Sequence, residues 1–229
     1  MIYMPSNHAS VWKYREQGYS MGWLMSPDGF RRPEKNGEAM PFALDNGLYF
    51  PPDQEPKGRE AIAAFYEMLG RCVRLGYEPI FVVTPDRPYD AERTRAMAAE
   101  HVPVIRGVGY AGPLAIAVQD GMELDDADGF DAIFVGGSTD WKWGTAEKWA
   151  AHANQTGRWC HIARVNTIHR VRQCVDMGAH SADGTGIFRG NKTQLAGVLE
   201  AVAERHLFFD RPSEQTLLDE WRSRYEGVA

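Results

Sequence analysis

Residues 159–186 read WCHIARVNTIHRVRQCVDMGAHSADGTG and contain one complete strand–helix–strand unit. The apolar run 159–163 predicts a buried strand, residues 167–177 predict a helix, and residues 179–182 predict a second strand that ends at Asp183. Strands joined through a helix are typical of a parallel sheet with right-handed crossovers. Because the residues after Asp183 are small, we expect its carboxylate to face a ligand.

The same alternation of strands and helices extends along most of the chain. Further strands are predicted at 2–4, 21–25, 41–44, 79–83, 114–118 and 131–135. Further helices are predicted at 10–17, 58–75, 91–100, 145–154 and 192–204, and an exposed loop at 29–38. About eight strands in this length favour a (β/α)8 TIM barrel over an open doubly wound sheet. We therefore expect one α/β domain, residues 1–229, without a zinc-binding subdomain.

Composition narrows the class of protein only a little. The formal net charge of -6 argues against a protein that binds nucleic acid through a broadly basic surface, although a local basic stripe could still bind a polyanion. The first residues lack a signal-peptide pattern, and no apolar run reaches membrane-spanning length. We expect a cytoplasmic protein with no membrane partner. Its three cysteines are widely separated, which predicts free thiols rather than a zinc site.

Polar or glycine residues stand at the ends of five predicted strands. They are Asp45, Asp86, Gln119, the pair Gly136 and Gly137, and Asp183. An aspartate before glycine is more often a turn or a helix cap than a catalyst when it stands alone. In a (β/α)8 barrel, however, these strand ends meet at one face, where active sites lie. Their shared position predicts a single site.

A second group of residues could hold phosphate. Gly184, Gly186 and Arg189 precede the last long predicted helix, whose backbone N–H groups and dipole favour an anion. Arg164 and Arg170 could add contacts to phosphate, and solvated surface arginines are an equal alternative.

Two further features have open alternatives. His161 lies inside an apolar strand, so we interpret it as a core or pocket-wall histidine, and no group of residues has the spacing of a metal site. Trp141, Lys142 and Trp143 could stack on nucleobases or pack beneath a loop.

Taken in order, the strand ends resemble the tRNA-guanine transglycosylase superfamily, and especially its shorter phage-encoded 7-deazaguanine DNA transglycosylases. The resemblance covers residues from about 41 to 190. Residues 45–49, Asp-Asn-Gly-Leu-Tyr, are similar to the Asp-Ser-Gly-Gly-Phe-like segment of that family. The strand end at Gln119 and the pair Gly136 and Gly137 are similar to its Val-Gln-Gly and Gly-Gly segments.

The resemblance implies a transferase that exchanges guanine in a polynucleotide for a 7-deazaguanine base. Asp183 would be the nucleophile that forms a covalent glycosyl-aspartate, and Asp45 the general acid and base. Asp86, Gln119, Gly136 and Gly137 would bind the base. Breaking an N-glycosidic bond with two carboxylates parallels retaining glycosidases and implies no metal and no organic cofactor.

The tRNA enzymes of that family carry a zinc subdomain with clustered cysteines, which this sequence lacks, so the resemblance implies DNA rather than tRNA as the substrate. The location would be the host cytoplasm if the protein is phage-encoded. A second copy of the chain or an accessory protein could present the nucleic acid. Three alternatives remain open at this point. The protein could be a tRNA-guanine transglycosylase, a nucleosidase or base-excising glycosylase in which water resolves the same intermediate, or an inactive barrel that only binds nucleic acid or a nucleobase.

Overall fold

The computed structural model describes residues 1–5, 9–49, 58–189, 192–203 and 214–225, apart from the side chains at 189, 192 and 193. Eight parallel strands form one sheet in the order β1-β10-β9-β8-β7-β6-β5-β2. The strands are β1 (Ile2–Tyr3), β2 (Trp23–Met25), β5 (Phe42–Leu44), β6 (Val82–Val83), β7 (Leu114–Val118), β8 (Ala132–Val135), β9 (Trp159–Ile162) and β10 (Ser181–Ala182). A parallel bridge between Tyr3 and Met21 brings the two edges together, so the barrel is nearly closed.

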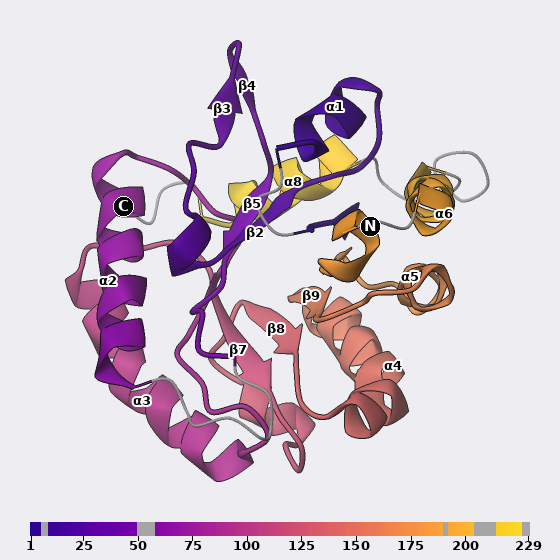
Figure 1. Ribbon diagram of the computed structural model, residues 1–229. Coiled ribbons are helices and arrows are strands. Elements are labelled where there is room, and N and C mark those ends of the chain that lie inside the picture. The colour runs from indigo at the N-terminus through magenta and orange to yellow at the C-terminus, as the bar shows by residue number, and fades with distance from the viewer. Residues whose placement is uncertain (6–8, 50–57, 190–191, 204–213, 226–229) are drawn as a thin grey trace.

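Helices surround the strands, as Figure 1 shows, with α2 and α3 on one side and α4, α5 and α6 on the other. The helices are α1 (Val11–Glu16), α2 (Arg59–Arg74), α3 (Ala91–Gly107), α4 (Thr139–Thr156), α5 (Ile168–Asp176), α6 (Lys192–Ala203) and α8 (Glu214–Ser223). Between β7 and β8 the connection contains only the short 3-10 helix η2 (Leu124–Ala127). The predicted α/β barrel is therefore confirmed.

Helix α2 illustrates why the predicted periodicity gives this packing. Its residues Phe65, Met68, Leu69 and Cys72 recur at steps of three and four and are all buried against the sheet. Shortly after the helix, Gly76 adopts a positive φ of 67°, a conformation that glycine allows without strain.

Two apolar clusters fill the two sides of the sheet. Side chains that alternate along the strands point either to the surrounding helices or into the barrel. The inner cluster contains Ile2, Met4, Phe81, Val83 and Trp159, together with small alanines of β7 and β8.

Helix α8 closes the amino end of the barrel. Its Trp221 packs 5.5 Å from Trp159, measured between ring centroids, and donates a hydrogen bond from Nε1 to the carbonyl of Ile80 at 2.8 Å. Leu218 from the same helix also joins the inner cluster. Helix α8 is not among the elements predicted from the sequence.

Three differences between the predicted elements and the structure bear on the local fold. Helix α4 begins at Thr139 rather than at residue 145, because Ser138 takes an extended N-cap conformation and Asp140 lies in the first turn. Helix α3 continues through Pro103 to Gly107. The predicted loop at 29–38 contains the antiparallel hairpin of β3 (Glu34–Lys35) and β4 (Glu38–Ala39).

The cysteines agree with the prediction of free thiols, since Cys72, Cys160 and Cys174 are all buried and unpaired. None of the described helices combines the length and apolar character that crossing a bilayer requires.

Candidate active site

A cavity of about 380 Å³ opens at the carboxyl ends of the strands. The residues predicted from the strand ends all line it: Asp45, Asp86, Gln119, Gly136, Gly137 and Asp183. They converge because each follows the last residues of a neighbouring parallel strand, from β5 through β10. Their placement in one cavity turns separate sequence signals into one candidate site.

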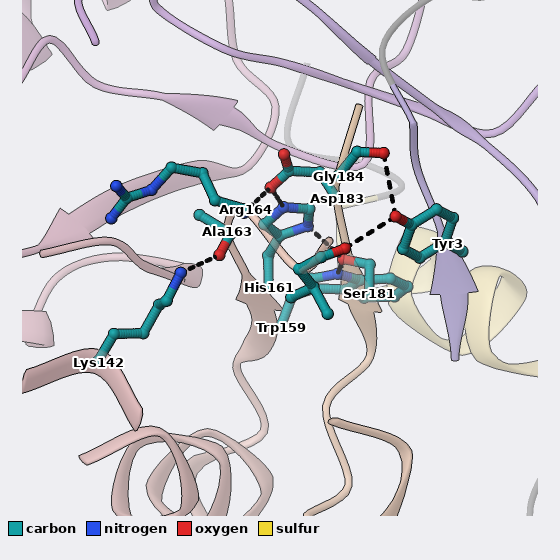
Figure 2. A network of polar contacts seen from close by, with 10 residues as sticks. Tyr3, Lys142, Trp159, His161, Ala163, Arg164, Ser181, Asp183 and Gly184 are labelled. Carbon is teal, nitrogen blue, oxygen red and sulfur yellow. Dashed lines mark hydrogen bonds and ion pairs between the residues drawn. The ribbon is translucent and has the colours of Figure 1, made fainter. Parts of the chain in front are cut away.

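Asp183 follows β10 directly and is held through one of its two carboxylate oxygens. Oδ1 accepts hydrogen bonds from Nε2 of His161 at 3.0 Å and from the backbone N–H of Arg164 at 3.0 Å. The side chain keeps 15% of its surface exposed, on the side of the cavity. Figure 2 shows the second oxygen pointing away from these donors.

His161 lies beneath Asp183 in the barrel interior and is completely buried. Its Nδ1 lies 2.8 Å from Oγ of Ser181, which accepts a hydrogen bond from Nε1 of Trp159 at 2.8 Å (Figure 2). The ring stacks on Phe134, with a centroid separation of 4.8 Å. His161 is thus a hydrogen-bonded core histidine rather than a pocket-wall residue, because it does not line the cavity and contacts Asp183 from below.

Asp45 occupies a different electrostatic environment from Asp183. Burial raises the pKa of its carboxyl to about 7, and the negative charges of Asp86 and Asp183 act in the same direction. The backbone N–H groups of Gly47 and Asn46 donate to the carboxylate and oppose this rise in pKa. A carboxyl group with a pKa near 7 can give up and accept a proton close to neutral pH.

Asp86 is buried, and each of its oxygens accepts a hydrogen bond from an amide. Nδ2 of Asn46 donates to Oδ1 at 2.7 Å, and Nε2 of Gln119 donates to Oδ2 at 2.7 Å. Burial raises the pKa of Asp86 to about 6, although both hydrogen bonds and the positive charge of Arg164 act against this rise. The amides thus fix a carboxylate at the cavity wall.

Gln119 and the glycine pair pack together as one unit. Oε1 of Gln119 accepts hydrogen bonds from the backbone N–H groups of Gly137 and Tyr89, both at 3.0 Å. Gly137 has a φ of 72°, and a Cβ there would lie 2.5 Å from the ring of Trp141. The glycines are needed for this close approach of the strand end to its neighbours.

Arg164 crosses the mouth of the cavity. Its guanidinium donates to the carbonyl of Gly137 and lies 4.9 Å from the ring centroid of Tyr49. The Tyr49 hydroxyl in turn lies 3.3 Å from that of Tyr89. Among the residues predicted to hold phosphate, Arg164 is thus brought to the cavity.

Among the described side chains, Arg170 and Gly186 do not line the cavity. Arg170 donates to Gln173 at 2.6 Å and stacks on Trp143. The N–H of Gly186 donates to Oδ1 of Asn166 at 2.9 Å, so it already has an acceptor. Arg189 belongs to η3 (Gly186–Arg189), and its side chain is outside the described part of the structure.

Gly184 has a packing role in place of an open approach to a ligand. It is buried, and a Cβ at this position would collide with the carbonyl of Val165 and the hydroxyl of Tyr3. That hydroxyl lies 3.0 Å from the Gly184 carbonyl and 2.9 Å from the Val165 carbonyl. The glycine therefore allows β1 and the loop after β10 to meet.

Trp141, Lys142 and Trp143 form part of the first two turns of α4, and none of them lines the cavity. Lys142 is buried and donates to the carbonyl of Ala163. Burial lowers the pKa of this amine to about 8. The structure supports the packing interpretation of this segment over base stacking.

Several lining residues were not assigned a role from the sequence. Asn46, Tyr49 and Tyr89 are the most consequential, because they hold Asp86, Arg164 and Gln119 respectively. Asn46 directly follows Asp45, so its place at a strand end was a usable signal. Tyr89 carried none, because its position depends on a positive φ of 68°.

No cluster of three or more His, Cys, Asp or Glu side chains suited to a metal ion occurs among the described residues. The described site instead offers carboxylates in three environments and amides that fix one of them. Comparison with models of known protein families gave no match, and comparison with curated protein sequences gave none either.

Proposed function

We propose that the protein is a transglycosylase that exchanges guanine in a polynucleotide, most simply DNA, for a 7-deazaguanine base. The observation that carries the proposal is the convergence of Asp183, Asp45 and Asp86 in one cavity with three different environments. Groups whose environments differ in this way can divide the roles of nucleophile, proton carrier and binding group. The cavity volume of about 380 Å³ lies in the usual range for small-ligand sites.

In the first half-reaction, Oδ2 of Asp183 attacks C1′ of the target nucleotide. The bond between C1′ and N9 breaks, and its electron pair leaves with guanine, which receives the proton of Asp45. The product is a covalent glycosyl ester of Asp183. The raised pKa of Asp45 supports this step, because a useful fraction of the carboxyl is protonated near pH 7.

In the second half-reaction, the same groups act in reverse. Ionised Asp45 removes the proton from N9 of the incoming 7-deazaguanine, and N9 attacks C1′. The ester bond to Asp183 breaks and returns its electron pair to the carboxylate. Asp45 ends the cycle protonated, so the reaction consumes no external acid or base.

Asp86 supports recognition of a guanine-like base. Its two oxygens each accept one amide hydrogen bond and retain further lone-pair capacity. The N1–H and the 2-amino group of guanine can both donate hydrogen bonds to such a carboxylate, whereas adenine presents an acceptor at N1. A site that depends on these polar contacts discriminates strongly against bases that lack them.

A nucleotide in a duplex would have to leave its stack to reach this cavity. Arg164, one of the predicted phosphate residues, lines the cavity, and its charge suits the backbone next to a flipped nucleotide. The proposal therefore includes a flipped or single-stranded target.

The test is incubation with isotope-labelled 7-deazaguanine bases and either duplex DNA, single-stranded DNA or tRNA, followed by mass spectrometry of the nucleosides. We expect label in DNA with the native protein and none with the Asp183→Asn variant. Label in tRNA alone would reject DNA as the substrate. Abasic sites without label would identify the hydrolase, and no change in any polymer would reject the proposal.

A further inference from the structure

We propose that His161 is a positioning residue for the nucleophile: its Nε2–H holds Oδ1 of Asp183, and the hydroxyl of Ser181 fixes the tautomer that makes this possible. The inference rests on the proposed function, because it assigns the attacking oxygen of that reaction. It is supported by a series of hydrogen bonds that runs from Trp159 through Ser181 and His161 to Asp183 (Figure 2).

The direction of these hydrogen bonds follows from the indole of Trp159, where the series begins. The indole N–H of Trp159 can only donate, so Oγ of Ser181 accepts this bond. The serine has one proton of its own, and among the described residues Oγ contacts, besides the indole, Nδ1 of His161 at 2.8 Å. The serine hydroxyl therefore donates to Nδ1, which leaves the ring proton on Nε2.

Burial makes this arrangement restrictive. Ser181 and His161 are both completely buried, so water cannot supply alternative partners. Phe134 stacks on one face of the imidazole, and the ring of Phe81 meets it at 66°, which limits rotation of the side chain. With the proton on Nε2, the ring donates to Oδ1 of Asp183 at 3.0 Å.

The backbone N–H of Arg164 supplies the second donor to the same oxygen. Arg164 has a φ of 57°, so this N–H is presented by an unusual left-handed conformation just after β9. Two fixed donors on Oδ1 prevent the carboxylate from exchanging its oxygens. Oδ2 is therefore the atom left to attack C1′.

The same two donors bear on the second half-reaction. In the ester, Oδ1 becomes a carbonyl oxygen, which accepts hydrogen bonds less strongly than a carboxylate oxygen does. The donors consequently favour return of the electron pair to Asp183 when the incoming base attacks. Loss of the Nε2 donor is therefore expected to slow release of the sugar. It should also slow capture of the sugar, because Oδ2 is then no longer held in place for attack.

The test compares two amides that differ in reach. His161→Gln places an amide nitrogen near the position of Nε2, whereas the shorter side chain of His161→Asn reaches only the position of Nδ1. We expect His161→Asn to lower kcat about 100-fold, the order of loss that misplacement by about 1 Å produces. The KM for the base should stay within about threefold, because Asp86 and Gln119 are untouched. His161→Gln should recover at least about tenfold of the lost kcat.

Equal kcat in the native protein and both variants would overturn the inference, and so would equal loss in the two variants when both remain folded by circular dichroism. Ser181→Ala supplies a variant outside the direct contact with Asp183. It should lower kcat by less than His161→Asn does, because it removes the hydrogen bond that fixes the tautomer but leaves the imidazole in place.

A readout independent of turnover separates this inference from the proposed function. In ¹⁵N-histidine-labelled protein at pH 7, the signals lost in His161→Gln identify His161, and we expect Nε2 to carry the proton and Nδ1 to carry none. A proton on Nδ1 would overturn the inference even if exchange occurs. A correct tautomer in a protein that exchanges no base would instead reject the proposed function alone.

Discussion

The two ends of the barrel are built from the same strands, but their interiors differ in chemistry. At the amino end, Trp159, Trp221 and Leu218 make an apolar plug whose buried indole N–H at Trp221 has a carbonyl partner. At the carboxyl end, Asp45 and Asp86 are held in surroundings that raise the pKa of each. Burying a carboxylate costs free energy, while burying apolar surface stabilises the fold. The difference indicates that the amino end stabilises the fold, while the carboxyl end bears the free-energy cost of the buried carboxylates that the proposed function uses.

The largest expected effect is a loss of activity when the carboxyl end, but not the amino end, is changed. Asp183→Asn removes the proposed nucleophile, so we expect base exchange to fall by at least about 10⁴-fold. The matched control is Asp128→Asn, which removes an exposed carboxylate near the amino end that pairs with Arg158 at 3.0 Å. The control should keep full activity, since surface ion pairs contribute little. Comparable losses in the two variants would contradict the division between the ends.

Substitutions at the amino end should lower the free energy of unfolding instead of the activity. Trp221→Ala creates a cavity in the plug and is expected to lower the free energy of unfolding by about 3–5 kcal/mol. Urea unfolding followed by fluorescence measures this loss. Trp221→Phe, which keeps most of the volume but lacks the N–H that bonds to Ile80, should cost about 1 kcal/mol. Folded protein of either variant should retain native kcat, and a lowered kcat would show that the ends are coupled.

Asp45→Asn should move activity and stability in opposite directions. Exchange is expected to fall about 10²–10⁴-fold because the proposed proton carrier is lost. The folded-state pKa of about 7 lies above the unfolded value, so ionisation of Asp45 costs stability progressively as pH rises from about 4 to 7. The variant lacks this cost. After allowance for solvent at a partly buried group, its melting temperature at pH 8 should exceed the native value by about 2–4 °C. The gain should vanish near pH 4, and a gain independent of pH would contradict this explanation.

The smallest effect is the pH dependence of exchange in the native protein. In the proposed mechanism, Asp86 must be ionised to accept hydrogen bonds from base N–H groups, which requires a pH above about 6. Asp45 must start protonated, which requires a pH below about 7. We expect a narrow maximum of kcat/KM between these values, with a fall approaching tenfold per pH unit on each side. In Asp45→Asn, the residual activity should lose the fall on the alkaline side. A native profile that is flat from pH 5 to 8 would be inconsistent with these roles.

The sequence predicted the convergence of the strand ends because that convergence depends only on topology. Once the pattern indicates a parallel barrel, Asp45, Gln119 and Asp183 must share one face. Contacts that depend on local backbone geometry were not predictable in the same way. The donor that Arg164 offers to Asp183 depends on a positive φ at a residue other than glycine. Likewise, the plug depends on α8, whose two inward side chains, Leu218 and Trp221, give too short a pattern to reveal their target.

The phosphate prediction shows a second limit. Gly184 is predicted from the sequence to help hold phosphate, yet the space beside it is filled by Tyr3 and Val165. A sequence reveals that a position lacks a side chain but not which neighbour uses the space.

The contact between Tyr3 and the loop that carries Asp183 also has a consequence for biosynthesis. The hydroxyl of Tyr3 bonds to the carbonyl of Gly184, 181 positions later in the chain, and β1 pairs with β10. Strand pairings between such distant segments form late in folding, because the chain between them must be ordered first. On the ribosome, the loop of Asp183 must therefore wait until residue 184 has left the exit tunnel. The proposed nucleophile therefore cannot be positioned before β1 has paired with β10.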